Sequence, residues 1–210
     1  MARQPNTELR RAEIVAAMLP VMARHGYERA TIQAIAGEAG LAPGLIHYHF
    51  KNKQEILVSL VESIAEFAQA RFAQVLGQAS APAERLEAYL QARLGLGEGA
   101  APDMVSAWVM IGVEAVRQAE VRQVYQRLVG AELEALTDLV GACLAEQGRE
   151  PSRALPIAAG LMALMEGAFL LSGAAEGLLP VGYAADAAIA FARQSVLVSP
   201  KGRRRSRMTP

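Results

Sequence analysis

The chain has 210 residues, 52% of them apolar and 5% aromatic, and its many Ala and Leu residues favour a helical protein of one or two domains with a sizeable core. A single cysteine, Cys143, excludes an internal disulfide framework and a multi-cysteine metal site. The net charge is zero, but residues 1–53 carry seven Lys or Arg against four Glu, and the segment from Lys201 carries five basic residues and no acid, a distribution that fits a DNA-facing end.

The first 30 residues predict a loose arm and one amphipathic helix. Residues 1–6 are polar and charged, with no signal-peptide pattern, so we expect a cytoplasmic protein. Apolar residues at helical spacing predict a helix over residues 7–25. Pro20 lies inside this helix and predicts a kink, because proline removes a backbone hydrogen bond. Gly26 is expected to end the helix.

Residues 31–53 have the pattern of two short helices joined by a tight turn. Thr31 is a suitable N-cap for the first helix, since its hydroxyl can accept a bond from a free backbone N–H. Gly40 stands where that helix should end, because glycine tolerates the left-handed conformation. Pro43 suits the first turn of the second helix, and Ile46 then points back at the first. This spacing is typical of a helix-turn-helix.

The residues after this turn are His47-Tyr48-His49-Phe50, followed by Lys53 at the start of another helix, and in this they resemble the TetR family of bacterial one-component transcriptional regulators. Gly26-Tyr27 and Thr31 also match the entry into the family's reading domain.

The resemblance implies an all-α protein with an N-terminal three-helix domain that contains the helix-turn-helix. We expect this DNA-binding domain over residues 1–52, a helical ligand-binding and dimerisation domain over residues 53–200, and a basic disordered tail over residues 201–210. It also implies a repressor that binds a palindromic double-stranded DNA operator as a homodimer and is released by a small-molecule effector, with no cofactor.

The second helix of the pair is expected to read the operator. We expect Tyr48, His49 and Lys53 to hold phosphates and Gly44 to let the helix backbone approach the DNA. The full set expected at the DNA is Thr31, Gln33, Ala42, Pro43, Gly44, Leu45, His47, Tyr48, His49 and Lys53. Ala42, Pro43 and Leu45 stand where the family usually carries Ser, Lys and Thr, so base reading would depend on thymine methyl groups and DNA shape.

The rest of the chain predicts further helices and shows no alternating strand pattern. The expected helices cover residues 53–78, 83–96, 103 onward, 121–147 and 184–198, with a flexible Gly- and Pro-rich loop between 95 and 102. Residues 154–175 form an apolar run with one charge, Glu166, and are long enough to span a bilayer. Because a mid-span Glu is costly in a membrane, we expect a buried core and interface helix and no membrane partner.

An effector site is expected in the helical body, among adaptable Met and aromatic side chains. Its expected residues are Tyr89, Met104, Trp108, Met110, Met162, Met165, Glu166 and Phe169. Glu166 would meet a cationic or hydroxylated ligand, or alternatively bond to a neighbouring helix. The segment over residues 108–128, WVMIGVEAVRQAEVRQVYQRL, resembles the choline-responsive betaine-pathway regulators of the family, which leaves the inducer open.

The dimer interface is expected on the last two helices, where small residues three or four apart form a bare ridge flanked by apolar bulk. Its expected residues are Gly160, Ala163, Leu164, Gly167, Leu171, Ala187 and Phe191. Two copies would bury this surface as a four-helix bundle.

No catalytic constellation stands out, and no metal site is expected, because His47 and His49 are two residues apart and point in different directions on a helix. We therefore expect no enzyme. Two rivals remain open at the level of sequence: a helical ligand-binding or interaction module that no longer binds DNA specifically, and a small helical enzyme.

Overall fold

The computed structural model describes residues 4–76, 79–95 and 102–197 and is built of α-helices, with no strand in those ranges. The α-helices are α1 Gln4–Arg29, α2 Ile32–Ala39, α3 Pro43–His49, α4 Lys53–Leu76, α5 Pro82–Leu94, α6 Pro102–Arg117, α7 Ala119–Glu146, α8 Ala154–Ala174 and α9 Tyr183–Leu197. A short 3-10 turn, Pro151–Arg153, precedes α8. The all-α prediction is confirmed. The expected flexible loop and the basic tail fall largely or wholly outside the described residues.

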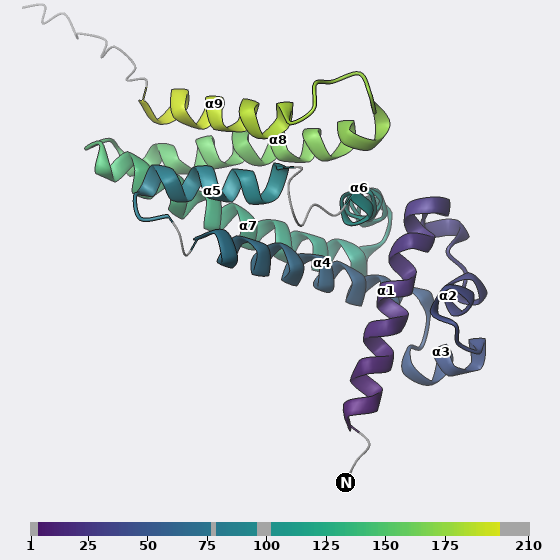
Figure 1. Cartoon of the computed structure of the whole chain (residues 1–210). Coiled ribbons are helices and arrows are strands. Elements are labelled where there is room, and N and C mark those ends of the chain that lie inside the picture. The colour runs from purple at the N-terminus through teal and green to yellow at the C-terminus, as the bar shows by residue number, and fades with distance from the viewer. Residues whose placement is uncertain (1–3, 77–78, 96–101, 198–210) are drawn as a thin grey trace, which may run out of the picture.

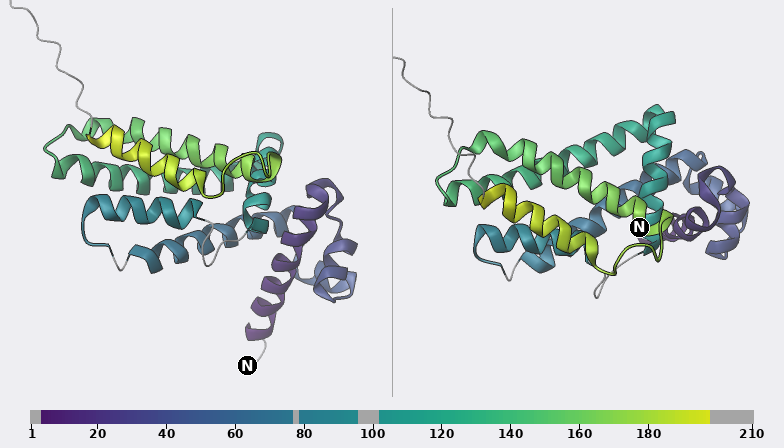
Figure 2. Two further views of the ribbon diagram at one scale, coloured as in Figure 1. Left: turned by 45° about the horizontal axis from the view of Figure 1, so that its top comes forward. Right: turned by 90° about the horizontal axis from the view of Figure 1, so that it is seen from above.

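Helices α1, α2 and α3 form a small group at one end of the molecule, and α4 leads from this group into a body that includes α5, α7, α8 and α9 (Figure 1). Helices α8 and α9 lie side by side along one flank of the body (Figure 2). Helix α6 packs against α1, α7 and α8, so it lies between the small group and the body. One continuous cluster of buried apolar residues runs through both parts.

The small group is held by a core of fully buried side chains from three helices, among them Met18 of α1, Ile35 of α2 and Ile46 of α3. The backbone of the first helix is non-helical at Gly26, with φ 75° and ψ 166°, so the chain breaks there. The expected end at Gly26 is therefore found, although the helical assignment continues through Pro20 and on to Arg29.

The turn between α2 and α3 follows local chemistry. The Thr31 hydroxyl accepts a hydrogen bond from the Ala34 N–H at 3.1 Å, which caps α2. Gly40 has φ 65°, and the next N–H, that of Leu41, bonds to the Ala36 carbonyl at 2.9 Å. Pro43 occupies the first turn of α3. The predicted helix-turn-helix is thus present.

Helix α8 is the one described helix that is long and apolar enough to cross a membrane. It packs against α6, α7 and α9, and its Ala158 and Leu161 are fully buried. These contacts are those of a core helix, whose apolar length serves packing within the protein.

Two glycines close together in the chain, Gly37 inside α2 and Gly40 at its end, allow a matched test of this geometry. Gly40→Ala should lower the free energy of unfolding by about 1 kcal/mol, because an L-residue is strained in the left-handed conformation. Gly37→Ala, inside α2 and with open space around it, should raise that free energy by about 0.5–1 kcal/mol. Urea denaturation monitored by circular dichroism measures both. Equal effects of the two changes would contradict the assigned turn.

Candidate DNA interface and effector cavity

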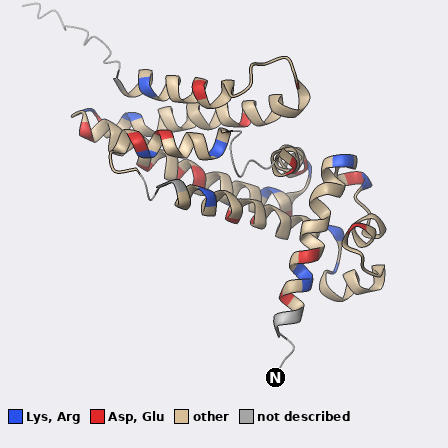
Figure 3. Ribbon diagram, in the orientation of Figure 1, with Lys and Arg blue, Asp and Glu red and all other residues tan. Residues whose placement is uncertain are grey.

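One face of the small group presents the residues expected at DNA. Exposed side chains or backbone are found at Thr31, Gln33, Ala42, Pro43, Gly44, Leu45, His47 and Tyr48. Tyr48 is 71% exposed although it is a large aromatic residue. Helix α3 carries no Lys, Arg, Asp or Glu, in contrast to α1 (Figure 3). A face of this kind can approach base edges and methyl groups, while phosphate contacts must come from flanking segments.

Two cationic side chains at the edge of this face, Lys53 and Arg11, donate hydrogen bonds to carbonyls at the ends of helices. The Lys53 ammonium donates to the Tyr27 carbonyl at 2.9 Å and lies 4.1 Å from the centre of the Tyr27 ring. The Arg11 guanidinium donates to the His49 carbonyl and lies 4.0 Å from the centre of the Phe50 ring. Both cations therefore neutralise carbonyls at the carboxyl ends of helices, where positive charge is favourable.

These contacts fix how α3 is presented. Arg11 belongs to α1 and also lies 3.7 Å from the carboxylate of Glu55, in the first turn of α4. It thereby connects the end of α3 with both of its neighbours. Sequence reasoning missed Arg11, because the contact spans 38 residues and leaves no local pattern. His49 and Lys53, both expected at phosphates, are half-buried.

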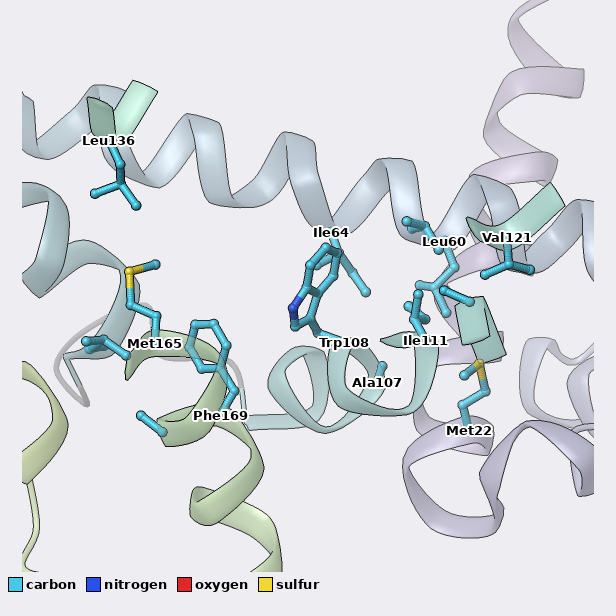
Figure 4. Close-up of a cluster of buried hydrophobic side chains, with 14 of the residues drawn as sticks. Met22, Leu60, Ile64, Ala107, Trp108, Ile111, Val121, Leu136, Met165 and Phe169 are labelled. Atoms are coloured by element: carbon cyan, nitrogen blue, oxygen red, sulfur yellow. The ribbon is translucent and has the colours of Figure 1, made fainter. Parts of the chain in front are cut away.

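The body contains a cavity of about 160 Å³ between α4, α5, α6, α7 and α8. Aromatic and aliphatic side chains form most of its wall, including Phe67, Phe72, Tyr89, Met104, Trp108, Leu128 and Phe169. Charged residues at the wall are Arg71, Arg93 and Glu132. Trp108 and Phe169 lie with Ile64 and Met165 in the buried cluster drawn in Figure 4.

Trp108 is held at the cavity wall by two neighbours. Its indole N–H donates to both carboxylate oxygens of Glu166 at 3.1 Å, and its ring stacks on Tyr125 with centroids 4.8 Å apart. Neither Glu166 nor Tyr125 lines the cavity itself. Gly112 lies next to the Tyr125 hydroxyl, and a Cβ at this position would touch it at an ordinary contact distance of 3.5 Å. Trp108 itself is a lining residue of the cavity.

The surroundings of Trp108 shift the pKa values of its two neighbours, Glu166 and Tyr125. Burial is the main cause that raises the pKa of Glu166, and the Trp108 N–H bond opposes it. Burial, with the carboxylates of Glu166 and Glu132, raises the pKa of Tyr125 to about 12. The ring of Tyr125 therefore stays neutral at neutral pH.

A second polar group lies at the α5 and α7 side of the cavity. The Tyr89 hydroxyl donates to Glu132 at 2.7 Å, and Arg93 forms an ion pair with the same carboxylate at 2.8 Å. Burial and the adjacent Glu132 raise the pKa of Tyr89 well above its ordinary value. The Arg93 guanidinium also lies 5.5 Å from the centre of the Phe169 ring.

Four of the residues expected at an effector line this cavity, namely Tyr89, Met104, Trp108 and Phe169. Glu166 does not line the cavity but accepts a hydrogen bond from Trp108 of α6. Of the two roles considered for Glu166, the structure therefore shows the bond to a neighbouring helix. Met110, Met162 and Met165 do not line the cavity, and Met165 is buried in the core. Sequence reasoning missed Glu132 and Arg93, because charged residues on helices usually indicate a solvated face. Within the described residues, no cluster of metal-ligating side chains occurs.

The residues expected at a dimer interface divide between two environments. Ala163, Leu171, Ala187 and Phe191 are exposed, whereas Leu164 and Gly167 are half-buried. Gly160 serves a contact within the chain, because a Cβ there would come within 3.0 Å of the Phe191 ring. The exposed stripe on α8 runs through Leu155, Ala159, Ala163, Leu170 and Leu171.

A helix-turn-helix with an outward reading face and, on the same chain, a lined cavity in a helical body define a ligand-responsive DNA-binding transcriptional regulator. Comparison with known families agrees: residues 14–60 match the model of bacterial regulatory proteins of the tetR family, and residues 82–197 match the C-terminal model of BetI-type transcriptional repressors. The chain belongs to the TetR family, and its C-terminal domain is of the BetI type.

Individual relatives are similar along most of the chain. The HTH-type transcriptional regulator BetI of Agrobacterium fabrum is 31% identical over 165 residues, which cover 77% of this chain and 76% of the relative. The regulator of the same name from Rhizobium meliloti is 28% identical over 165 residues, covering 77% of each chain.

Solved structures share the fold. A transcriptional regulator from Saccharomonospora viridis, solved in complex with choline, superposes with a TM-score of 0.78 at 23% identity, covering 88% of this chain and 95% of that one. A regulator from Pseudomonas aeruginosa PAO1 gives a TM-score of 0.76 at 22% identity, covering 88% of each chain.

The raised pKa of Glu166 has a measurable consequence. A carboxyl group whose pKa is higher in the folded state stabilises the fold while protonated, and this stabilisation is lost as pH rises through the folded-state pKa. Glu166→Gln should therefore equal the wild type in thermal midpoint below about pH 4 and exceed it near neutral pH. Glu134→Gln, an exposed change on α7, is the control and should show no such divergence. A wild type more stable than Glu166→Gln at neutral pH would contradict this account.

Proposed function

We propose that this regulator is a repressor acting in the cytoplasm, whose effector is a small quaternary ammonium compound bound in the cavity against Trp108. The observation that supports the proposal is an aromatic wall, formed by Trp108 with Tyr89, Phe72 and Phe169, with carboxylates close behind it. Aromatic faces attract cations through the ring quadrupole, and aromatic cages are the usual receptors of quaternary ammonium groups.

The size of the cavity fits such a compound. A cavity of about 150 Å³ in another protein accommodates benzene, a molecule of six heavy atoms. The 160 Å³ available here therefore suits an effector of similar or slightly larger size, such as choline. The neighbour from Saccharomonospora viridis that is solved with choline shares the fold, which adds support for a ligand of this chemistry.

Release from DNA requires that the effector bind better to the released state than to the DNA-bound state. Helix α6 suits this role, since Trp108 lies at its cavity end and its other end reaches the DNA-binding domain. At that end, Gln118 donates to Glu114 at 2.8 Å and contacts the hydroxyl of Tyr27. A shift of α6 on ligand binding would move the surface on which α1 rests.

We further propose a homodimer joined through α8 and α9. The exposed face of α8 is an apolar stripe, and the single charge of that helix, Glu166, is turned toward Trp108 instead. Phe191 adds a 37%-exposed ring from α9. Such a surface on a soluble protein favours pairing with a second copy. Pairing would set two copies of α3 at a spacing that suits a palindromic operator.

The effector proposal predicts a coupled optical and DNA-binding response. Choline should change the emission of Trp108, the one tryptophan of the chain, over the same concentration range in which it releases operator DNA. Trp108→Leu should weaken choline binding about tenfold, since a cation–π contact contributes about 1–2 kcal/mol. Calorimetry measures the affinity and fluorescence anisotropy the DNA release. DNA release by choline without any emission change would contradict the placement against Trp108.

The dimer proposal is tested by one charge in the stripe. Ala163→Arg should give monomers with wild-type helicity and strongly reduced operator affinity. Ala145→Arg, at an equally exposed alanine on α7, is the control and should stay dimeric. Multi-angle light scattering reports the mass. A wild type that is monomeric at micromolar concentration, or a dimeric Ala163→Arg, would place the interface elsewhere.

Lys53 is proposed to approach a phosphate while it also holds the end of α1. Lys53→Ala should weaken binding to operator and random DNA alike and make the salt dependence shallower by about one unit. It should also lower the thermal midpoint, because the Tyr27 carbonyl loses its ammonium donor. Lys51→Ala removes an exposed charge nearby and serves as the stability control. An unchanged salt slope for Lys53→Ala would leave that residue a purely structural role.

A further inference from the structure

The charges around the cavity are not all compensated. Four charged side chains line it or stand directly behind its wall: Arg71, Arg93, Glu132 and Glu166. Arg93 and Glu132 form an ion pair at 2.8 Å, which Tyr89 completes with a hydrogen bond to the same carboxylate. One cation, Arg71, and one carboxylate, Glu166, then remain, each without an oppositely charged partner within 4.0 Å among the residues that the structure describes.

Arg71 is half-buried on α4 and lines the cavity directly. Among the described residues it makes one long hydrogen bond, 3.4 Å, from a terminal nitrogen to the Gly95 carbonyl. A guanidinium offers five N–H donors in a planar fork that matches a carboxylate. That bond uses one of the five donors, so the guanidinium that lines the cavity keeps donors for an anionic group of a ligand.

Glu166 marks the other end of the cavity. Its carboxylate accepts the Trp108 N–H and contacts the Tyr125 hydroxyl, both neutral groups. A negative charge bound to the indole N–H makes the ring of Trp108, which lines the cavity, a better site for a cation. This charge pairs with no cation of the chain within salt-bridge distance in the described ranges.

The two unpaired charges are separated along the fold. Trp108 packs beside Ile64, as Figure 4 shows, and Arg71 follows Ile64 by seven residues on α4. Seven residues of α-helix span about 10 Å, of which long side chains can bridge a part. The cavity therefore favours a cation at the Trp108 end and an anion at the Arg71 end.

We propose that the effector is a short zwitterion that carries a quaternary ammonium group and a carboxylate, with the ammonium on the Trp108 face and the carboxylate on Arg71. This inference rests on the proposed function, which places a quaternary ammonium compound in the cavity. A simple cation would leave Arg71 without an oppositely charged partner among the described residues, and a simple anion would face the charge of Glu166. A zwitterion matches both charges without disturbing the Arg93–Glu132 pair.

Three ligands of nearly equal size test the contribution of each charged group to binding. Trimethylglycine has both groups, its methyl ester keeps the ammonium and removes the negative charge, and choline replaces the carboxylate with a hydroxyl. Calorimetry on the full chain should show trimethylglycine binding at least about tenfold more tightly than its methyl ester, the gain expected from a charge-assisted bidentate contact. If the wild-type protein binds trimethylglycine and its methyl ester with equal affinity, that result alone would overturn the inference.

Arg71→Gln tests the residue. The variant should weaken trimethylglycine by about tenfold or more and change choline affinity little, so the ratio of the two affinities falls. Arg85→Gln removes an exposed arginine of α5 that does not line the cavity, and should leave the ratio unchanged. An unchanged ratio in Arg71→Gln would overturn the assignment.

Binding of the three compounds to the wild type separates a failure of the zwitterion from a failure of the quaternary ammonium site. If choline binds and trimethylglycine binds no better than its ester, the zwitterion is refuted while the quaternary ammonium site stands. If none of the three compounds binds to the wild type, the proposed effector class fails and the inference fails with it.

Discussion

The packing of α6 is the constraint on which the rest of this structure depends. One helix contributes Trp108 to the effector cavity and Ile111 and Ala115 to the core that meets α1. Met22 of α1 lies with Ile111 and Val121 in that core (Figure 4). Because packed interiors are dense and yield little, a displacement of Trp108 is transmitted along the helix to its far end. We propose that this one helix, with contacts at both ends, couples the cavity to the DNA-binding domain.

Polar contacts also connect the DNA-binding domain to the helices of the body. Lys53 and Gln118 both meet Tyr27, one at its carbonyl and ring and the other at its hydroxyl. Gln54 of α4 also donates to Glu120 of α7 at 2.9 Å. Helix α3 itself has no Lys, Arg, Asp or Glu, and Arg11 of α1 holds its carboxyl end. The position of α3 thus depends on groups that are not part of its outward face.

The sequence was sufficient where structure follows from neighbouring residues. The cap at Thr31, the left-handed turn at Gly40 and the start of α3 at Pro43 are all local, and all were predicted. The cavity depends on pairs distant in the chain, such as Trp108 with Glu166, 58 residues apart, or Tyr89 with Glu132, 43 residues apart. No spacing rule reports such pairs. A helical apolar pattern likewise cannot tell a core methionine such as Met165 from a cavity methionine such as Met104.

The central claim is that the effector cavity and the DNA interface are energetically coupled. Coupling between two binding sites is reciprocal, so a ligand that weakens DNA binding must itself bind less tightly to the DNA-bound protein, by the same factor. The most direct test is calorimetric titration of the wild type with choline and with trimethylglycine, in the absence and in the presence of saturating operator DNA. The account predicts weaker binding of the effector to the complex, by the factor measured for DNA release. Equal affinity for the free and the DNA-bound protein would contradict it.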